Sequence, residues 1–219
     1  MEEKQKPEKT EKKSGFSMYD FYSLLHDLVY LLSGLILIFV FCVRLVAVSG
    51  QSMMPTLHNK DYLVLQSSTF MGKLKYGDIV VTRGVRYEDG ELQMFEGGEP
   101  IVKRVIATEG QKVEIYQAED QQIHVFVDGK MLDEPYIQEE MRPYYFLDDQ
   151  DGDPNRFSTT VSDGCIFVMG DNRNNSADSR HPEIGEIKTE QVLGKVLLIA
   201  LPAREPDGRR DFSRFGTVH

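Results

Sequence analysis

The sequence predicts a mainly β domain with antiparallel strands, preceded by one N-terminal transmembrane helix. Two features predict this fold class. One long apolar run lies near the N-terminus, and the remaining chain alternates short segments rich in Val, Ile, Tyr and Phe with Gly, Asp and Asn. At 219 residues, with 41% hydrophobic and 27% charged residues, the chain has room for one globular domain of modest size besides the helix.

The apolar run begins at Leu28 and reaches Val48 if Arg44 extends its charged end toward water. At about 1.5 Å per residue, residues 28–48 form a helix of about 31 Å, which matches one hydrocarbon thickness. A cleaved secretory signal is the alternative, because residues 47–49 resemble a small-x-small cleavage site. The run is longer than the usual signal core, so we predict a transmembrane helix over 28–48.

The charges that flank this helix predict its orientation. Only Lys and Arg count strongly for orientation, and five lysines precede the run, whereas Arg44 alone lies near its far end. We therefore expect residues 1–27 to be a cytoplasmic tail and the chain from residue 49 onward to be extracytoplasmic, on a single-pass protein of the cell membrane in contact with membrane lipid. The five lysines are Lys4, Lys6, Lys9, Lys12 and Lys13.

The extracytoplasmic domain is expected over residues 49–203, followed by a polar, loosely held C-terminal tail over 204–219. Its strand-like segments lie at 61–68, 77–84, 101–110, 111–117, 122–129, 164–171 and 192–201. Asp128-Gly129 predicts a hairpin turn. Two stretches that interrupt the strands, near 86–100 and 132–163, are predicted to be variable loops.

Charge and residue types exclude several classes of function. Residues 49–219 hold 19 basic and 29 acidic side chains, and this acidic excess argues against a nucleic-acid partner. The histidines show no metal-binding spacing, and the acidic stretch 148–155 lacks the Gly and Glu of a calcium loop. Cys42 and Cys165 are interpreted as small hydrophobic residues without a disulfide. We expect no metal and no cofactor.

The stretch VSGQSMMPTL directly after the apolar run contains a candidate nucleophile, Ser52. A serine hydroxyl needs a base beside it, and no histidine lies in a segment that otherwise resembles a site. Lysine can serve if its pKa falls by about 3 units, which full burial can supply. Because only three residues separate Val48 from Ser52, we expect Ser52 to lie close to the outer membrane surface.

Lys103 is the candidate for that base. In a strand over 101–107, alternate residues share one face, which makes Lys103 the only charged member of an otherwise apolar row. The row also contains Ile101, Val105 and Ala107. From the pattern alone, an edge-strand lysine with its stem on apolar surface and its amine in water remains open.

The segment GDNRNNSADSR, from Gly170 to Arg180, is the third candidate. It could be a polar turn that is held by its own side chains. Alternatively, its hydroxyls could orient the lysine amine while its Asp and Arg residues hold the loop rigid. The segment alone does not decide between these interpretations.

Together these segments resemble the bacterial type I signal peptidase family. SGQSMMPTL fits the nucleophile motif, GDIVV (77–81) the next, VKRVIATEG the lysine motif and GDNRNNSADSR the last, in the family's order behind an N-terminal anchor. The resemblance covers residues 49–202, and the single span resembles the Gram-positive form. It implies a Ser–Lys serine protease that removes signal peptides from secretory preproteins after small residues of the A-x-A type, with the protein export machinery as a neighbour.

The resemblance also implies roles for individual residues. Ser52 would be the nucleophile and Lys103 the general base, with Ser176 bonded to the lysine amine. Asp178 with Arg180, and also Arg104, would brace the loop, and Met53 would line the substrate pocket. The oxyanion hole would use the Ser52 N–H. Because this chain has Gly50 where some relatives carry a hydroxyl, the second donor would be a backbone group there, or the hole would be looser. Asn174, where many members have Asp, could keep a hydrogen bond but not an ion pair.

Two other classes of protein remain as alternatives. The fold is similar to that of self-cleaving LexA-like repressors, but these cut at Ala-Gly or Cys-Gly, neither of which occurs here. A catalytically inactive, membrane-anchored binding ectodomain is the second. It is disfavoured because Ser52, Lys103, Ser176 and Asp178 are all present.

Overall fold

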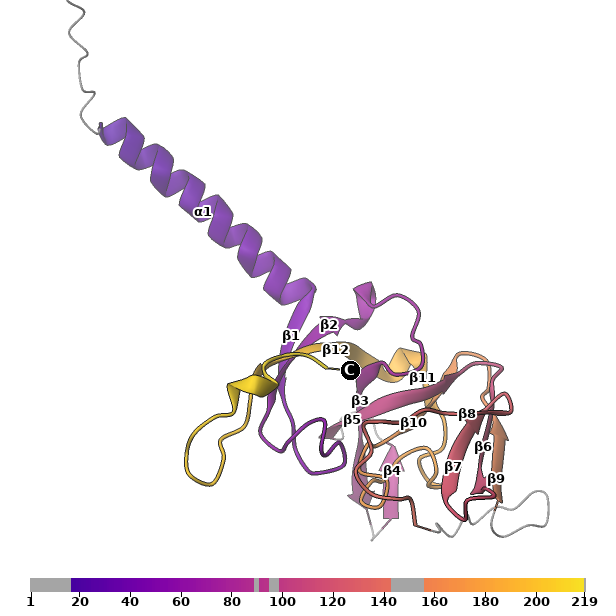
Figure 1. The fold of residues 1–219 in the computed structure, drawn as a ribbon. Coiled ribbons are helices and arrows are strands. Elements are labelled where there is room, and N and C mark those ends of the chain that lie inside the picture. Colours follow the sequence, from indigo (N-terminus) through magenta and orange to yellow (C-terminus); the bar gives the residue numbers. More distant parts are fainter. Residues whose placement is uncertain (1–16, 89–90, 95–98, 143–155, 219) are drawn as a thin grey trace, which may run out of the picture. The chain divides into compact units, whose positions relative to one another are not determined.

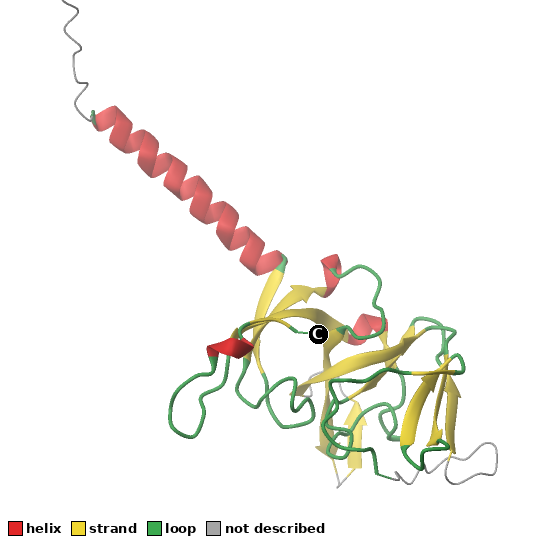
Figure 2. Ribbon diagram, in the orientation of Figure 1, coloured by secondary structure: helices red, strands yellow, loops and turns green. Residues whose placement is uncertain are grey.

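A computed structural model describes residues 17–88, 91–94, 99–142 and 156–218. The chain divides into two units, Met1–Phe41 and Cys42–His219. The described part of the first unit is a helix, and the second unit is built mainly of antiparallel strands, drawn yellow in Figure 2. The predicted fold class is therefore confirmed.

The N-terminal helix α1 spans Met18–Phe41 and begins ten residues before the predicted start at Leu28. Its first turn is capped reciprocally: the Tyr19 N–H donates to Ser17 Oγ (3.2 Å), and the Ser17 N–H donates to Asp20 Oδ2 (2.8 Å). With 24 residues, α1 is long and apolar enough to cross a membrane.

The predicted helix end at Val48 is wrong, because the helix ends at Phe41 and Val43–Ala47 form strand β1. An apolar run does not by itself distinguish a helix from a strand, and β-branched valines favour the strand. β1 pairs antiparallel with β2, Tyr62–Ser67. Residues 42–51, rather than three residues, therefore separate the helix from Ser52.

All seven predicted strand segments are confirmed, and several short strands are added to them. The predicted segments correspond to β2 and to β3 Ile79–Glu88, β5 Glu99–Thr108, β6 Lys112–Gln117, β7 Ile123–Val127, β10 Cys165–Met169 and β12 Val192–Leu201. The added strands are β1 and β4 Glu91–Met94, β8 Lys130–Met131, β9 Arg156–Thr160, β11 Ile187–Lys188 and β13 Gly216–Thr217. Short 3-10 helices η1 to η3 lie at Ser68–Phe70, Thr189–Gln191 and Phe212–Arg214. Asp128 and Gly129 have φ of 51° and 74°, as the predicted hairpin turn requires.

Within the described residues the strands form two sheets (Figure 1). The larger has the order β1-β2-β12-β3-β5-β10-β11, with β4 on β3 and β13 on β12; the smaller has the order β8-β7-β6-β9. One core cluster joins β6 and β7 to β5 and β10, through residues such as Ile115, Val125, Ile106 and Phe167. β5 is thus an interior strand with neighbours on both edges.

The two predicted variable loops contain regular structure. Near 86–100, β3 continues to Glu88 and pairs with β4, and β5 begins at Glu99, so part of this stretch is a hairpin. Within 132–163, residues 156–160 form β9, because their backbone pairs with β6. The acidic stretch considered as a calcium loop lies outside the described residues.

The C-terminal segment is not loosely held, contrary to the prediction over 204–219. β13 pairs with β12, and the Arg214 guanidinium donates to both carboxylate oxygens of Asp61 at 3.1 and 2.7 Å. Asp61 also accepts the His58 N–H (2.7 Å) and the Ala203 N–H (2.7 Å). Burial raises the pKa of the Asp61 carboxyl, but Arg214 and these N–H groups outweigh it and hold the pKa below its usual value.

We predict that Arg214→Ala lowers the free energy of unfolding by about 3 kcal/mol, because it leaves the fully buried Asp61 carboxylate without its ion pair. Urea unfolding of the full chain in detergent measures this. The control is Arg209→Ala, since Arg209 pairs only at the surface and should change stability by no more than about 0.5 kcal/mol. Equal stabilities of the two variants would contradict the prediction.

Candidate functional site

Ser52, the candidate nucleophile, lies between β1 and β2 in a turn of residues 50–60, which we call the nucleophile turn after this candidate. The hairpin closes this turn, because the Val48 N–H donates to the Asp61 carbonyl and the Lys60 N–H to the Val48 carbonyl, both at 2.8 Å. Leu57 packs in the hydrophobic core beneath the turn. The turn is thereby fixed at its ends and underneath, while Ser52 itself is half-buried.

Lys103 lies on β5 and is only 3% exposed. Its Nζ donates a hydrogen bond to Ser52 Oγ at 2.8 Å. The edge-strand alternative is therefore wrong, because β5 pairs with β3 on one side and β10 on the other. Pairing from both sides removes the solvated edge along which the lysine could reach water.

The burial of Lys103 gives its amine the properties of a base. Burial lowers the pKa of Lys103 to about 8, because the charged ammonium loses its hydration. Asp178 opposes this shift and raises the pKa, Arg180 lowers it, and Asp171 raises it. Desolvation is the largest of these effects and sets the direction of the shift.

The segment from Gly170 to Arg180, here the 170–180 loop, follows β10 and is held from within. Asp178 binds the Arg180 guanidinium through both carboxylate oxygens, at 2.8 and 2.9 Å, and accepts the Gly170 N–H at 2.9 Å. Both Asp178 and Arg180 are buried. Burial raises the pKa of the Asp178 carboxyl, but Arg180 and the Gly170 N–H outweigh it and keep the carboxyl ionised.

The 170–180 loop also binds the nucleophile turn directly. The Asn172 N–H donates to the Ser52 carbonyl oxygen at 3.0 Å, and Asn172 Nδ2 donates to the Gln51 carbonyl at 3.1 Å. The β5–β10 register pairs Met169 with Arg104, so the loop begins beside Lys103. Ser52, Lys103 and the loop therefore form one connected site.

Ser176 does not make the hydrogen bond to the Lys103 amine that the resemblance implies. Its hydroxyl oxygen is buried and has no hydrogen-bond partner among the described residues. The hydroxyl lies close enough to Asp178 to help lower the pKa of that carboxyl, although the two groups do not meet at hydrogen-bond geometry. Ser176 thus lies beside Asp178 rather than on the Lys103 amine.

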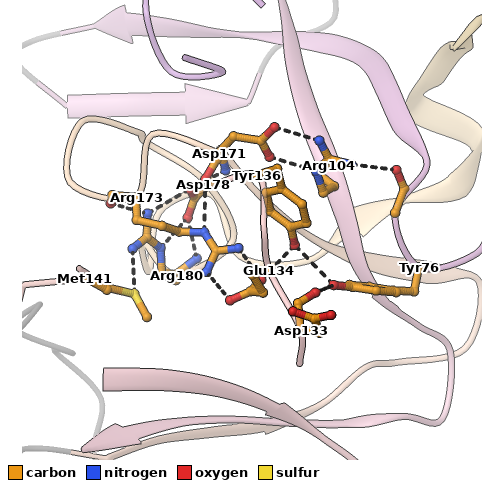
Figure 3. A network of polar contacts seen from close by, with 12 residues as sticks. Tyr76, Arg104, Asp133, Glu134, Tyr136, Met141, Asp171, Arg173, Asp178 and Arg180 are labelled. Atoms are coloured by element: carbon orange, nitrogen blue, oxygen red, sulfur yellow. Dashed lines mark hydrogen bonds and ion pairs between the residues drawn. The ribbon is translucent and has the colours of Figure 1, made fainter. Parts of the chain in front are cut away.

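Arg104 braces the 170–180 loop, as expected, and its partner is Asp171, which the sequence did not single out. Nε and Nη2 of Arg104 donate to the two Asp171 oxygens at 2.8 and 2.7 Å, and both side chains are buried (Figure 3). Asp171 also accepts the Thr56 hydroxyl from the nucleophile turn. The position of Asp171, directly after a buried strand, was the available signal.

Two other expected residues lie differently from their implied roles. Met53 is 2% exposed and packs in the core beside Leu57, so it offers a substrate little surface. The Gly50 N–H donates to Asn59 Oδ1 at 3.2 Å and is not free to hold an oxyanion. The Ser52 N–H, in contrast, makes no hydrogen bond with any part of the chain that the structure describes.

Asn174 keeps a hydrogen bond without an ion pair, as its neutral amide predicts. Its Oδ1 accepts the Arg142 N–H at 2.9 Å, and its Nδ2 donates to the Glu140 carbonyl at 3.0 Å. These contacts connect the 170–180 loop to residues that precede it in the chain. In the described ranges, no group of three His, Cys, Asp or Glu residues is placed to hold a metal ion.

Comparison with known proteins shows similarity to signal peptidases over most of the chain. Residues 22–201 match the family described as signal peptidase, peptidase S26. The signal peptidase I of Bacillus caldolyticus is 35% identical over 162 residues, which cover 68% of this chain and 74% of that protein. Probable signal peptidase I-1 of Synechocystis sp. (strain ATCC 27184 / PCC 6803 / Kazusa) is 35% identical over 160 residues, which cover 71% of this chain and 70% of that protein. Signal peptidase I S of Bacillus subtilis (strain 168) is 33% identical over 166 residues, with 72% and 77% covered.

We predict that Gly170→Ala separates the nucleophile turn from the 170–180 loop. An added Cβ would lie 2.5 Å from the Ser52 carbonyl oxygen and closer still to the Ser176 hydroxyl, so one of the two segments must move. The unfolding temperature and the peptidase activity should both decrease. The activity should decrease by more than the loss of folded protein explains.

Gly164→Ala is the matched control for this prediction. Gly164 has a φ of 71° but open space around its Cβ position, so the substitution adds only backbone strain of about 1 kcal/mol away from the site. Wild-type activity in the folded Gly170→Ala protein would show that the close approach is unnecessary.

Proposed function

Because this chain belongs to the signal peptidase S26 family, and is a serine peptidase that cleaves signal peptides from preproteins, we propose that Ser52 and Lys103 carry out the cleavage. Ser52 is the nucleophile and Lys103 its general base. The observation that carries this proposal is the 2.8 Å contact between Lys103 Nζ and Ser52 Oγ, made by an amine that is 3% exposed. No other lysine in the described residues contacts Ser52.

The proposed reaction proceeds through an ester. Neutral Lys103 accepts the Ser52 hydroxyl proton while Oγ bonds to the scissile carbonyl carbon, and the resulting ammonium returns that proton to the departing amine as the peptide bond breaks. The same amine then takes a proton from water, which attacks the ester. As the ester bond breaks, the Lys103 ammonium returns that proton to Ser52 Oγ, which releases the signal peptide's carboxylate and restores the free enzyme. With a pKa of about 8, Lys103 is neutral in about a tenth of molecules near pH 7.

The Ser52 N–H is the oxyanion donor that this arrangement supports. It makes no hydrogen bond within the described residues and belongs to the attacking residue itself, which places it near the developing charge. The Gly50 N–H would first have to leave Asn59 to contribute. The small-residue, A-x-A type of cleavage site is the substrate preference we propose, with Met53 beneath the nucleophile turn rather than exposed on it.

We place the protein in the cell membrane, with α1 as a single anchor. The apolar length of α1 supports anchoring, and the five lysines that precede it support a cytoplasmic N-terminus. The catalytic domain would then be extracytoplasmic, beside the lipid surface and the export machinery that delivers preproteins. A signal peptide enters from the same membrane.

We predict that Ser52→Ala and Lys103→Ala each lower kcat/KM by at least about 1,000-fold, because neither half of a nucleophile and base pair works alone. The assay incubates purified full-length protein in detergent with a preprotein and quantifies the mature product. Exposed Ser162→Ala and Lys130→Ala are the matched controls and should retain activity. Equal processing by wild type and by folded Ser52→Ala would refute the mechanism.

We predict that kcat/KM rises with pH through a midpoint near 8 and then levels off. The sign follows from the base: protonated Lys103 cannot accept the Ser52 proton, so activity is lost as pH falls below the pKa and is full above it. Measuring initial rates from about pH 6 to about pH 10 tests this. A profile that is flat across this range, or that falls with rising pH, would contradict a lysine base.

A further inference from the structure

The bridging segment, which we define as residues 132–142 after β8, lies against the 170–180 loop through a buried ion pair. Glu134 accepts hydrogen bonds from Nη1 (2.8 Å) and Nη2 of Arg173, and the two side chains are 8% and 1% exposed. The Tyr136 hydroxyl donates to the same carboxylate at 2.7 Å. Figure 3 shows these three side chains between the bridging segment and the loop.

Arg173 transmits this contact into the loop. Its Nε donates to the Gly170 carbonyl at 3.2 Å, and its own carbonyl accepts Nη2 of Arg180 at 2.8 Å. Gly170 donates its N–H to Asp178, which also binds Arg180. Arg173 is therefore bonded to both ends of the loop that contacts the Ser52 carbonyl.

Tyr136 contacts two of the arginines that hold the 170–180 loop. Its ring lies under the Arg104 guanidinium at 3.9 Å and also faces Arg173 at 5.9 Å. Its hydroxyl lies 3.3 Å from the Tyr76 hydroxyl, which donates to the Asp133 carbonyl. The ring and the hydroxyl thus fix where the Glu134 carboxylate lies.

We propose that Glu134 is a positioning residue for Lys103, acting through Arg173 to keep the 170–180 loop closed against the lysine amine. The inference rests on the proposed function of Lys103. A buried ion pair adds little net stability over well-packed apolar residues, so the role we assign to this pair is to define the geometry of the loop rather than to add stability. If the carboxylate is removed, Arg173 loses its partner, the loop loosens, and water reaches the amine.

The experiment compares Glu134→Gln with Asp133→Asn in the full chain. Asp133 is the matched control, because it is the exposed neighbouring acid and enters the network only through its backbone carbonyl. For Glu134→Gln we expect the midpoint of the kcat/KM profile to move up by about one pH unit, since desolvation is the largest cause that lowers the pKa of Lys103. The charges that shift this pKa are those of Asp178, Arg180 and Asp171, so the loss of the Glu134 charge itself adds little. Activity near pH 7 should then fall about tenfold but recover near pH 10. Asp133→Asn should keep the wild-type profile.

This recovery separates positioning from a general structural role, because a smaller folded fraction would lower the rate equally at every pH. If Glu134→Gln does not fold, Tyr136→Phe replaces it, since that variant removes only the hydroxyl that holds Glu134. We expect a smaller shift in the same direction. An unchanged midpoint in the folded variant overturns the inference, whatever its rate.

A direct titration distinguishes this inference from the proposed function. In protein labelled with ¹³Cε-lysine, the Lys103 signal is identified by its absence from Lys103→Ala and gives the pKa without any turnover. If Ser52→Ala processes preprotein as wild type does, the proposed function fails, but the titration still decides whether Glu134 sets the Lys103 pKa. Equal Lys103 titrations in wild type and in Glu134→Gln overturn the inference alone.

Discussion

The Lys103 amine lies in the middle of an interior strand, where a charged ammonium has lost most of its hydration. The same group would be a poor base in water, since its ordinary pKa leaves well under about 0.1% neutral near pH 7. Burial on β5 lowers the pKa of Lys103 to about 8, so that about a tenth of the molecules carry a neutral amine near pH 7. The rest of the site consists of the segments that pack around this amine and exclude water from it.

To exclude water from the amine, polar loops must pack around it, and their polar groups then need hydrogen-bond partners within the protein. The structure meets this requirement with three arginine–carboxylate pairs, each buried on both sides: Arg104–Asp171, Arg173–Glu134 and Arg180–Asp178. Each pair is close to neutral overall, so it satisfies backbone carbonyls without adding a net charge beside the lysine. A net negative charge there would raise the pKa of Lys103 and weaken it as a base at neutral pH.

Much of this arrangement could be predicted from local patterns. Short segments rich in Val, Ile, Tyr and Phe, separated by Gly, Asp and Asn, located seven strands. Alternation along one of these strands separated the row of Lys103 from that of Arg104. The end of the helix could not be located this way, because the apolar run continues into β1 and the choice depends on pairing with β2. The start of the helix could have been predicted from the Ser17-x-x-Asp20 capping box, but the prediction placed it at the start of the apolar run instead.

The contacts that hold the site were harder to predict. Glu134 and Arg173 are 39 residues apart, and neither lies in a periodic segment, so no pattern indicates that they meet. The family resemblance implied roles for Ser176 and Gly50 in the site, but it could not predict which groups they bond to in this structure. Ser176 and the Gly50 N–H depend on hydroxyl and amide directions that a motif does not encode.

The ion pair between Asp61 and Arg214 has a consequence for the order in which the site forms. The partners are 153 residues apart, and Asp61 closes the turn that carries Ser52. Ribosomal synthesis produces the serine early and the arginine late, so the turn reaches its final stability only after almost the whole domain has been made. A nascent chain that already contains Ser52 therefore still lacks the ion pair that fixes the turn around it, and this turn is completed together with the domain rather than locally.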